Sequence, residues 1–305
     1  MHLGNGVVCP ISAIVMFDAA GVGTYFAFRG AKKEFCKDKV FYAITLTCLV
    51  FALQMINFSI PQTGSSGHII GALLLCALLG ANSAFLAICA ILTIQALFFS
   101  DGGLLALGCN IVNMGVMTCF VAYLFIYKPL EKSNKPFLAA LLASIVALQL
   151  GALMVVLEGV FSGSIAIHLT AKFCVLMQFI HLPIGVVEGV FSALLIAAAK
   201  KINYKKMSAF FGFSALTLAA FIVQYASQKP DGLEWSLMNI QDGVFMQVQN
   251  KFYLIANMIQ NKTAFVSNMP FAAANLFGIL AVGLVMYFIC LFILPQGEKI
   301  SERKV

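Results

Sequence analysis

Histidine is the side chain in this sequence best suited to bind a transition metal, and the chain has only four. His2 directly follows Met1, so the terminal amine, the backbone nitrogen of His2 and one of its imidazole nitrogens could chelate one ion through two fused rings. Such donors suit the later divalent transition metals, and a planar nitrogen set suits nickel or copper best. The alternative is that a histidine occupies the second position by chance.

One more nitrogen would complete a planar set, and we favour His68 as its source. It ends the charge-free stretch Gly64-Ser65-Ser66-Gly67-His68, which lies between two hydrophobic segments. Gly4 and Gly6 give the first residues the backbone freedom to fold back. We therefore predict a metal site on the outer face of the protein, contributed by three residues: Met1, His2 and His68.

The elements that hold these residues are expected to lie in a membrane. Of the 305 residues, 61% are hydrophobic and 10% are charged, whereas soluble domains carry about 25% charged residues. Several windows reach the roughly 20 apolar residues that a helix needs to cross a bilayer. No basic residue precedes Arg29, so the first hydrophobic segment is predicted to remain as a span and not to be a signal peptide. The sequence predicts an all-α polytopic protein of the bacterial inner membrane.

We predict nine transmembrane helices, with the amino terminus outside and the carboxyl terminus in the cytoplasm. The predicted spans are 10–28, 39–59, 68–80, 82–99, 103–127, 136–157, 170–199, 208–227 and 270–294. Basic residues fill alternate connections and the tail, and the positive-inside rule places these segments in the cytoplasm. The net charge of +7 follows from this topology and indicates no nucleic-acid partner. The 68–80 span is too short to cross alone, so we expect it to pack against 82–99 after a break at Gly80.

Several polar residues inside the apolar spans are open to two interpretations. Gln95 and Asn110 are expected to bridge helices, with lining of the metal pocket as the alternative. His181 and Glu188 share one helical face, and we favour a packed structural pair or a subunit contact over metal ligation. Asp18 is a similar case, because small residues beside it allow another helix to approach.

Other features exclude several kinds of site. The nine cysteines include no Cys-x-x-Cys pair, most fall in apolar runs, and they are predicted to be small core residues. Asp101 is expected in an outer loop, where solvation explains it. The sequence has no Gly-x-x-x-x-Gly-Lys-Ser/Thr phosphate loop and no catalytic cluster, so we predict no enzyme, no ATP hydrolysis by this chain and no resident cofactor.

A change of composition at 200–207 divides the chain into two predicted domains, 1–206 and 207–305. The second has two spans and a long outer segment, which opens with the turn signal Pro230-Asp231-Gly232. Apolar residues with helical spacing follow in that segment: Leu254, Ile255, Met258 and Ile259.

Several motifs, in this order, resemble the CbiM/NikM family, the metal-specific membrane subunits of energy-coupling-factor transporters for cobalt and nickel. They are Met1-His2, residues 63–71, Gln95-Ala96-Leu97, Leu107-Gly108-Cys109-Asn110 and His181-Leu182-Pro183-Ile184. The remainder, with Pro230-Asp231-Gly232-Leu233-Glu234, resembles the PDGLE domain, an accessory N component often fused to nickel-type members. One departure is Asn5, where the family often has an acidic residue, so the loop before Gly6 is uncharged.

The resemblance implies that the terminal amine, the His2 nitrogens and His68 bind the ion. It also implies partners, a transmembrane coupling protein and ATPase subunits, and an accessory domain that assists uptake. The expected function is capture of Ni²⁺, with Co²⁺ as the second candidate, for an ATP-driven importer. Two alternatives stay open: a secondary permease driven by an ion gradient through Asp18, His181 and Glu188, and a membrane assembly protein that transports nothing.

Overall fold

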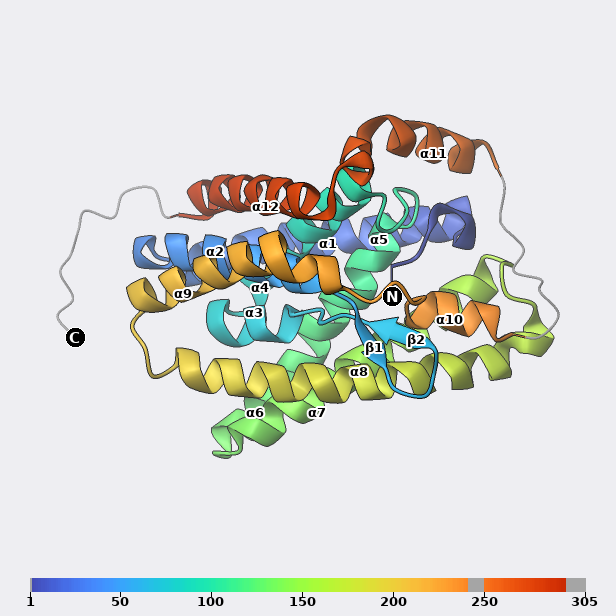
Figure 1. Ribbon diagram of the computed structural model, residues 1–305. Helices are drawn as coiled ribbons and strands as arrows, with labels where there is room; N and C mark the ends of the chain where they lie inside the picture. Colours follow the sequence, from blue (N-terminus) through green and yellow to red (C-terminus); the bar gives the residue numbers. More distant parts are fainter. Residues whose placement is uncertain (1, 241–249, 295–305) are drawn as a thin grey trace.

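The computed structural model describes residues 2–240 and 250–294. Figure 1 shows long helices lying side by side in one bundle, with a small hairpin and the short helix α10 next to each other. The elements in chain order are α1 (Pro10–Glu34), α2 (Val40–Gln54), β1 (Phe58–Ile60), β2 (Ser65–Gly67), α3 (Ala72–Leu79), α4 (Ala81–Ile94), α5 (Leu107–Asn110), α6 (Lys128–Lys132), α7 (Pro136–Phe161), α8 (Thr170–Ala199), α9 (Tyr204–Thr217), α10 (Gly232–Met238), α11 (Lys251–Thr263) and α12 (Phe271–Ile293).

Wider π-helical stretches extend three of these helices. The segment Gln95–Phe99 continues α4, Ile111–Tyr127 joins α5 to α6, and Leu218–Ile222 continues α9. Such stretches occur often at functional sites. The one after α4 ends at the loop that carries Asp101.

Seven helices among the described residues are long and apolar enough to cross a membrane, which confirms the multi-pass membrane class. They are Pro10–Lys33, Ala81–Phe99, Leu107–Lys132, Pro136–Phe161, Ile167–Ala199, Tyr204–Tyr225 and Phe271–Ile293. The other two predicted spans correspond to shorter helices: α2 has 15 residues and α3 has 8. At 1.5 Å per residue, α2 is about 22 Å long, less than the ~30 Å hydrocarbon core.

The structure is mostly helical, as predicted, and a short pair of strands is a local departure from the all-α prediction. The predicted span 39–59 ends early, because the chain leaves α2 at Gln54 and enters β1. β1 and β2 form an antiparallel pair in which Phe58 lies opposite Gly67 and Ile60 opposite Ser65. We call residues 58–67 the hairpin. A polar turn rich in Gly and Ser suits a hairpin better than the end of a transmembrane helix.

The break predicted at Gly80 is confirmed. Gly80 has φ of +88° and separates α3 from α4, which pack against each other. Side-chain-bearing residues rarely adopt this φ, so glycine permits the reversal. α3 is enclosed by protein, with Leu73, Leu74 and Leu75 fully buried. Its short length is therefore compatible with a membrane protein, because neighbouring helices shield its ends from lipid.

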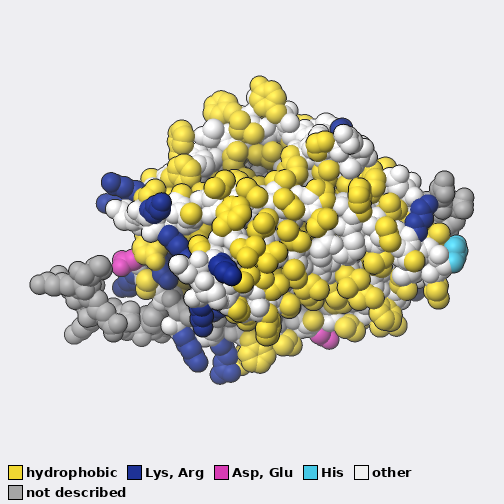
Figure 2. Space-filling view, turned by 90° about the horizontal axis from the view of Figure 1, so that it is seen from below, with side chains coloured by type: hydrophobic (Ala, Val, Ile, Leu, Met, Phe, Trp, Pro, Cys, Tyr) yellow, Lys and Arg dark blue, Asp and Glu magenta, His cyan; other side chains and the backbone are white. Residues whose placement is uncertain are grey.

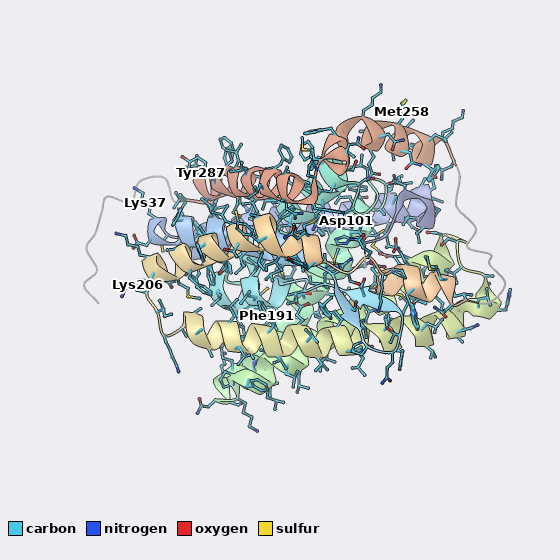
Figure 3. All side chains as sticks on the ribbon, in the orientation of Figure 1. Lys37, Asp101, Phe191, Lys206, Met258 and Tyr287 are labelled. Carbon is cyan, nitrogen blue, oxygen red and sulfur yellow. The ribbon has the colours of Figure 1, made fainter. Side chains whose placement is uncertain are left out.

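The surface divides into an apolar belt and a basic end. Figure 2 shows hydrophobic side chains over most of one face and Lys and Arg side chains gathered mainly at one end of it. Figure 3 labels Lys37 and Lys206 at that end, and Asp101 well away from it. Large apolar side chains such as those of Phe213, Leu280 and Phe292 are more than 70% exposed, as expected for a surface that faces lipid.

Helices from the second half of the chain pack onto the first half at several places. α9 and α12 both pack against α2, α10 packs against α8, and α11 packs against the π-helical end of α4. α10 begins at a capping box, in which Asp231 accepts from the Glu234 backbone N–H and Glu234 reaches back to the Asp231 N–H. The predicted Pro-Asp-Gly turn is therefore the start of a helix that lies over the hairpin and α8.

Candidate metal centre

Residues 2–8, which we call the amino-terminal arm, fold back against the loop before α5. The Leu3 side chain is fully buried. The Leu3 backbone N–H donates to Asn110 Oδ1 at 2.8 Å. The Leu3 carbonyl accepts from Asn110 Nδ2 at 3.2 Å and from the Gly103 N–H at 2.7 Å. Asn110 thus holds the backbone next to His2 on both sides. These contacts differ from both roles considered for Asn110, helix bridging and pocket lining, because Asn110 binds the arm and is not among the residues that line the cavity.

The hairpin places His68 beside this arm. All three β2 residues are buried, and His68 follows them directly with 8% of its surface exposed. The His2 and His68 rings are stacked, with centroids 5.2 Å apart and planes 16° from parallel. Two histidines separated by 66 positions in the sequence therefore lie together. Met1, the third predicted contributor, lies outside the described residues.

Burial keeps both imidazoles in the form that binds metals. Loss of hydration lowers the pKa of His2 to about 3 and that of His68 to about 3. Both rings are consequently neutral at any physiological pH, and a neutral ring has one nitrogen with a free lone pair. Neither imidazole therefore carries a positive charge that must be lost as a proton before an ion binds.

Asp101 contacts His2, which corrects the expectation that solvation explains it. Asp101 Oδ1 lies 3.1 Å from His2 Nδ1, within the distance of an ion pair. The fused-ring chelate uses the same nitrogen, because only Nδ1 can close a small ring with the His2 backbone nitrogen. An ion bound through Nδ1 would therefore lie near the Asp101 carboxylate.

Both histidines line one cavity of about 530 Å³. The second half of the chain supplies much of its other wall, including Lys229, Asp231, Asn257 and Gln260. Among the described residues, no group of three or more His, Cys, Asp or Glu side chains is placed to hold a metal ion. A metal centre at His2 and His68 would therefore depend on main-chain nitrogens as well as on the two imidazoles.

Residues 229–235, which we call the accessory turn, lie against the hairpin. The Ser66 N–H donates to the Pro230 carbonyl at 2.8 Å, and Ser66 Oγ donates to the Lys229 carbonyl at 2.8 Å. Trp235 Nε1 donates to the Thr63 carbonyl at 2.8 Å. The segment that carries His68 is thus fixed by the second half of the chain as well as by the first.

Glu188 holds the backbone just beyond His68. Its carboxylate is buried and accepts from the N–H groups of Ile70 at 2.9 Å and Gly71 at 3.1 Å. One helical turn earlier on α8, Ile184 packs against Gly67 so closely that a methyl group on that glycine would lie 2.6 Å from it. These contacts agree with the structural role favoured for Glu188.

His181 and Gln95 also lie beside the centre without lining the main cavity. His181 Nδ1 donates to the Met177 carbonyl at 2.7 Å, and a methyl group on Gly232 would lie 3.0 Å from the His181 ring. His181 therefore supports the accessory turn. Gln95 is fully buried, and its Nε2 faces Met55 Sδ at 3.7 Å. Asp18 is exposed on α1 and is not part of the cavity wall.

Replacement of Glu188 by alanine is expected to weaken metal binding without removing any metal donor. Two buried N–H groups would lose their acceptor, at a cost of about 1–3 kcal/mol each. The resulting loosening of residues 68–71 should lower Ni²⁺ affinity roughly tenfold to a hundredfold, the range usual for groups that orient a ligand. Isothermal titration calorimetry checks this, with Glu188→Gln, which keeps one acceptor oxygen, as the intermediate case. Unchanged affinity in Glu188→Ala would contradict the positioning role.

Comparison with known proteins identifies the class of this centre. Residues 2–206 match the family model described as the cobalt uptake substrate-specific transmembrane region, CbiM. The chain belongs to the CbiM family. Residues 205–294 match the PDGLE domain, so both resemblances found in the motifs are confirmed. CbiM proteins are membrane components of cobalt and nickel transport, which makes this chain a transport component.

Individual relatives agree with this assignment. A protein of Haloquadratum walsbyi, provisionally named a metal transport protein, is 33% identical over 205 residues, 66% of this chain and 91% of that protein. A protein of Archaeoglobus fulgidus, provisionally named fused nickel transport protein NikMN, is 35% identical over 176 residues, 57% of this chain and little more than half, 58%, of that protein. A crystal structure of a truncated transition metal transporter superposes with a TM-score of 0.58 at 29% identity, covering 66% of this chain and 99% of that one.

Two residues of the second half that line the cavity, Asn257 and Gln260, gave no recognised signal in the sequence. Asn257 and Gln260 lie three positions apart on α11, on the side opposite the apolar residues that drew attention to this helix. A second buried carboxylate, Glu158 on α7, was also missed; it accepts from Asn113 Nδ2 at 2.8 Å. A polar pair at helical spacing within an otherwise apolar pattern is the signal that could have revealed Asn257 and Gln260.

Proposed function

We propose that this chain captures Ni²⁺ as the membrane subunit of an ATP-driven energy-coupling-factor importer. The observation that carries this proposal is the stacked pair of His2 and His68, which line one cavity. The donor set is the terminal amine of Met1, the backbone nitrogen and Nδ1 of His2, and one ring nitrogen of His68. Four nitrogens close to one plane favour Ni²⁺ over Co²⁺. The relative named as a nickel transport protein supports the same choice.

We further propose an orientation in which the centre faces outward. The basic end marked by Lys37 and Lys206 is then cytoplasmic, in accord with the positive-inside rule. Counting α2 and α3 as passes beside the seven long helices gives nine, which leaves the carboxyl terminus in the cytoplasm. An ion taken from outside the cell would reach the cavity without first crossing the membrane.

Partner proteins are part of this proposal, and α1 supports it. Only 17% of the apolar window of α1 is buried inside the chain, and Asp18 is exposed along it. A carboxylate facing lipid costs about 3 kcal/mol or more. A transmembrane coupling protein that packs against α1 would remove Asp18 from lipid, and ATPase subunits bound to that protein would supply the energy.

The secondary-permease alternative finds less support. Its three candidate residues do not come together, because Asp18 is exposed on α1, whereas Glu188 and His181 are buried on α8. The carboxylate of Glu188 and one nitrogen of His181 are already occupied by backbone groups. A proton path through these three residues would need each to change its surroundings.

The ion and the energy source can be tested together. Purified wild-type protein is expected to retain Ni²⁺ with one ion per chain and to prefer it to Co²⁺ by about tenfold or more in competition. Planar Ni²⁺ with four nitrogen donors is diamagnetic, so bound nickel should give no paramagnetic signal. Uptake by cells should require an active ATPase partner and survive collapse of the proton gradient. Uptake by this chain alone, abolished by that collapse, would overturn the proposal in favour of a permease.

A further inference from the structure

α11 presents its polar side inward and its apolar side outward. Only Ala256 and Gln260 of its 13 residues are buried, whereas Leu254 is 62% exposed and Met258 is 54% exposed. Figure 3 shows Met258 at the edge of the molecule. Helices of globular domains normally attach through an apolar stripe. α11 has little of one facing the centre, so its inward attachment depends largely on hydrogen bonds.

Those hydrogen bonds converge on Asn5 of the amino-terminal arm. Asn5 Nδ2 donates to Asn257 Oδ1 at 2.6 Å and to Gln260 Oε1 at 2.8 Å. Gln260 Nε2 donates to the carbonyls of Ala96 at 2.9 Å and Gly102 at 2.7 Å. Asn5 and Gln260 are 6% and 4% exposed, so water cannot easily replace these partners.

The backbone fixes which way each amide points. Gln260 Nε2 faces two carbonyls, which only accept, so Gln260 Oε1 must face Asn5 and accept from it. At the other end, Asn5 Oδ1 faces the Leu105 N–H at 2.8 Å, which only donates, so Asn5 Nδ2 must face Gln260. The two amides form one directed chain between two groups of the 102–105 loop. Neither amide can be inverted without losing bonds.

This chain of bonds joins the amino-terminal arm to the loop beside His2. Asn5 is three positions after His2, and the 102–105 loop follows Asp101, which contacts the His2 ring. The Gly103 N–H of the same loop binds the Leu3 carbonyl. Gly103 also approaches Asn5 so closely that a methyl group there would overlap it. α11 therefore restrains both the backbone and the carboxylate beside His2.

We propose that α11 acts as a clasp that preorganises the His2 half of the metal centre, with Gln260 and Asn257 as its positioning residues and Asn5 as the group they hold. This inference rests on the proposed function only for the identity of the ion. An arm that is already ordered loses less conformational entropy when an ion binds. The clasp therefore strengthens binding mainly by slowing the release of the arm, and with it the release of the ion.

The clasp requires a nitrogen at the Nδ2 position of Asn5, because that atom donates both hydrogen bonds to α11. An aspartate at this position would still accept from the Leu105 N–H, but its second oxygen would face the oxygens of Asn257 and Gln260. Asn5→Asp is therefore an isosteric variant that converts two donated bonds into repulsive contacts. Gln260→Ala removes the same link from the other side. Asn261→Ala, at the exposed neighbouring position of α11, is the matched control.

The test uses the full chain in detergent and two measurements. Hydrogen–deuterium exchange of the metal-free protein should show residues 3–8 exchanging about tenfold faster in Gln260→Ala and Asn5→Asp, because each loses at least one buried bond. Dissociation of Ni²⁺ into excess chelator should be about tenfold faster in both variants and unchanged in Asn261→Ala. In the double variant Asn5→Asp/Gln260→Ala the effects should fall short of additive, because the residues act through one link.

The outcomes separate the clasp from the proposed function. If the wild type binds Ni²⁺ and both variants match it within twofold in exchange and dissociation, the clasp is wrong and the proposed function stands. If the wild type binds no Ni²⁺, the proposed function fails, and arm exchange in the metal-free protein still decides the clasp. Additive effects of Asn5→Asp and Gln260→Ala would show two independent contacts and would also overturn it.

Discussion

His68→Ala is expected to reduce the affinity for Ni²⁺ by more than about a hundredfold, the upper end of the loss seen when only an orienting partner of a ligand is removed. The alanine removes a ring nitrogen that no other side chain can supply, because the described residues include no spare cluster of His, Cys, Asp or Glu at the cavity. His2 would also lose the ring stacked against it at 5.2 Å. Metal analysis of purified protein and calorimetric titration measure this loss.

His168→Ala is the control for this variant. His168 is exposed in the turn Ile167–Leu169 and is not part of the cavity wall, so its replacement should leave Ni²⁺ affinity unchanged. His2→Ala should behave like His68→Ala. Full nickel binding by either cavity variant, with normal amounts in the membrane, would remove the histidine pair from the proposed centre.

A one-residue extension ahead of Met1 is expected to abolish tight Ni²⁺ binding. The extension converts the amine of Met1 into an amide and moves the new amine out of chelate reach of His2. Loss should exceed about a hundredfold, since a first-sphere donor is removed and its chelate ring is broken. A cleavable extension supplies the control: proteolysis that restores Met1 as the first residue should restore binding. Tight binding by the extended protein would exclude the amine as a ligand.

Proton release provides a second measurement on the same proteins. The imidazoles are already neutral, since burial lowers the pKa of His2 and of His68 to about 3. Protons released on Ni²⁺ binding must then come from the terminal ammonium, whose usual pKa is about 7.7–8.0, and from the His2 backbone N–H. Binding should weaken as pH falls below that range, with two protons released per ion. The extended protein should lose this signature.

The local parts of this molecule could be predicted from sequence because short-range patterns determine them. Hydrophobic length reveals the seven long helices, and Gly80 reveals the break between α3 and α4. α2 was predicted too long because apolar residues continue past Gln54 into the hairpin, and hydropathy does not distinguish a buried strand from the end of a helix. The pairing of His2 with His68 was predicted from donor chemistry and not from a fold.

The long-range parts could not be predicted in the same way. Asn5 and Gln260 are separated by 255 positions, and no local pattern indicates that two amides so far apart will meet. Asp101 was expected to be solvated because it lies in a predicted outer loop. Its contact with His2 depends on long-range contacts, among them those of Asn110 and the Gly103 N–H, that bring the arm to that loop. Such contacts depend on tertiary packing, which composition does not encode.

The attachment of α8 links the two ends of the bundle mechanically. Lys200, at the basic end of α8, forms an ion pair with Glu131 of α6. Twelve residues earlier, Glu188 accepts hydrogen bonds from the backbone just after His68. No proline interrupts the helix between these points, a distance of about 18 Å, whereas Pro183 lies on the far side of Glu188. A displacement of Lys200 would therefore be transmitted along a continuous helical segment to the loop that carries His68. Any bend in α8 is expected at Pro183, which lies outside the segment between Glu188 and Lys200.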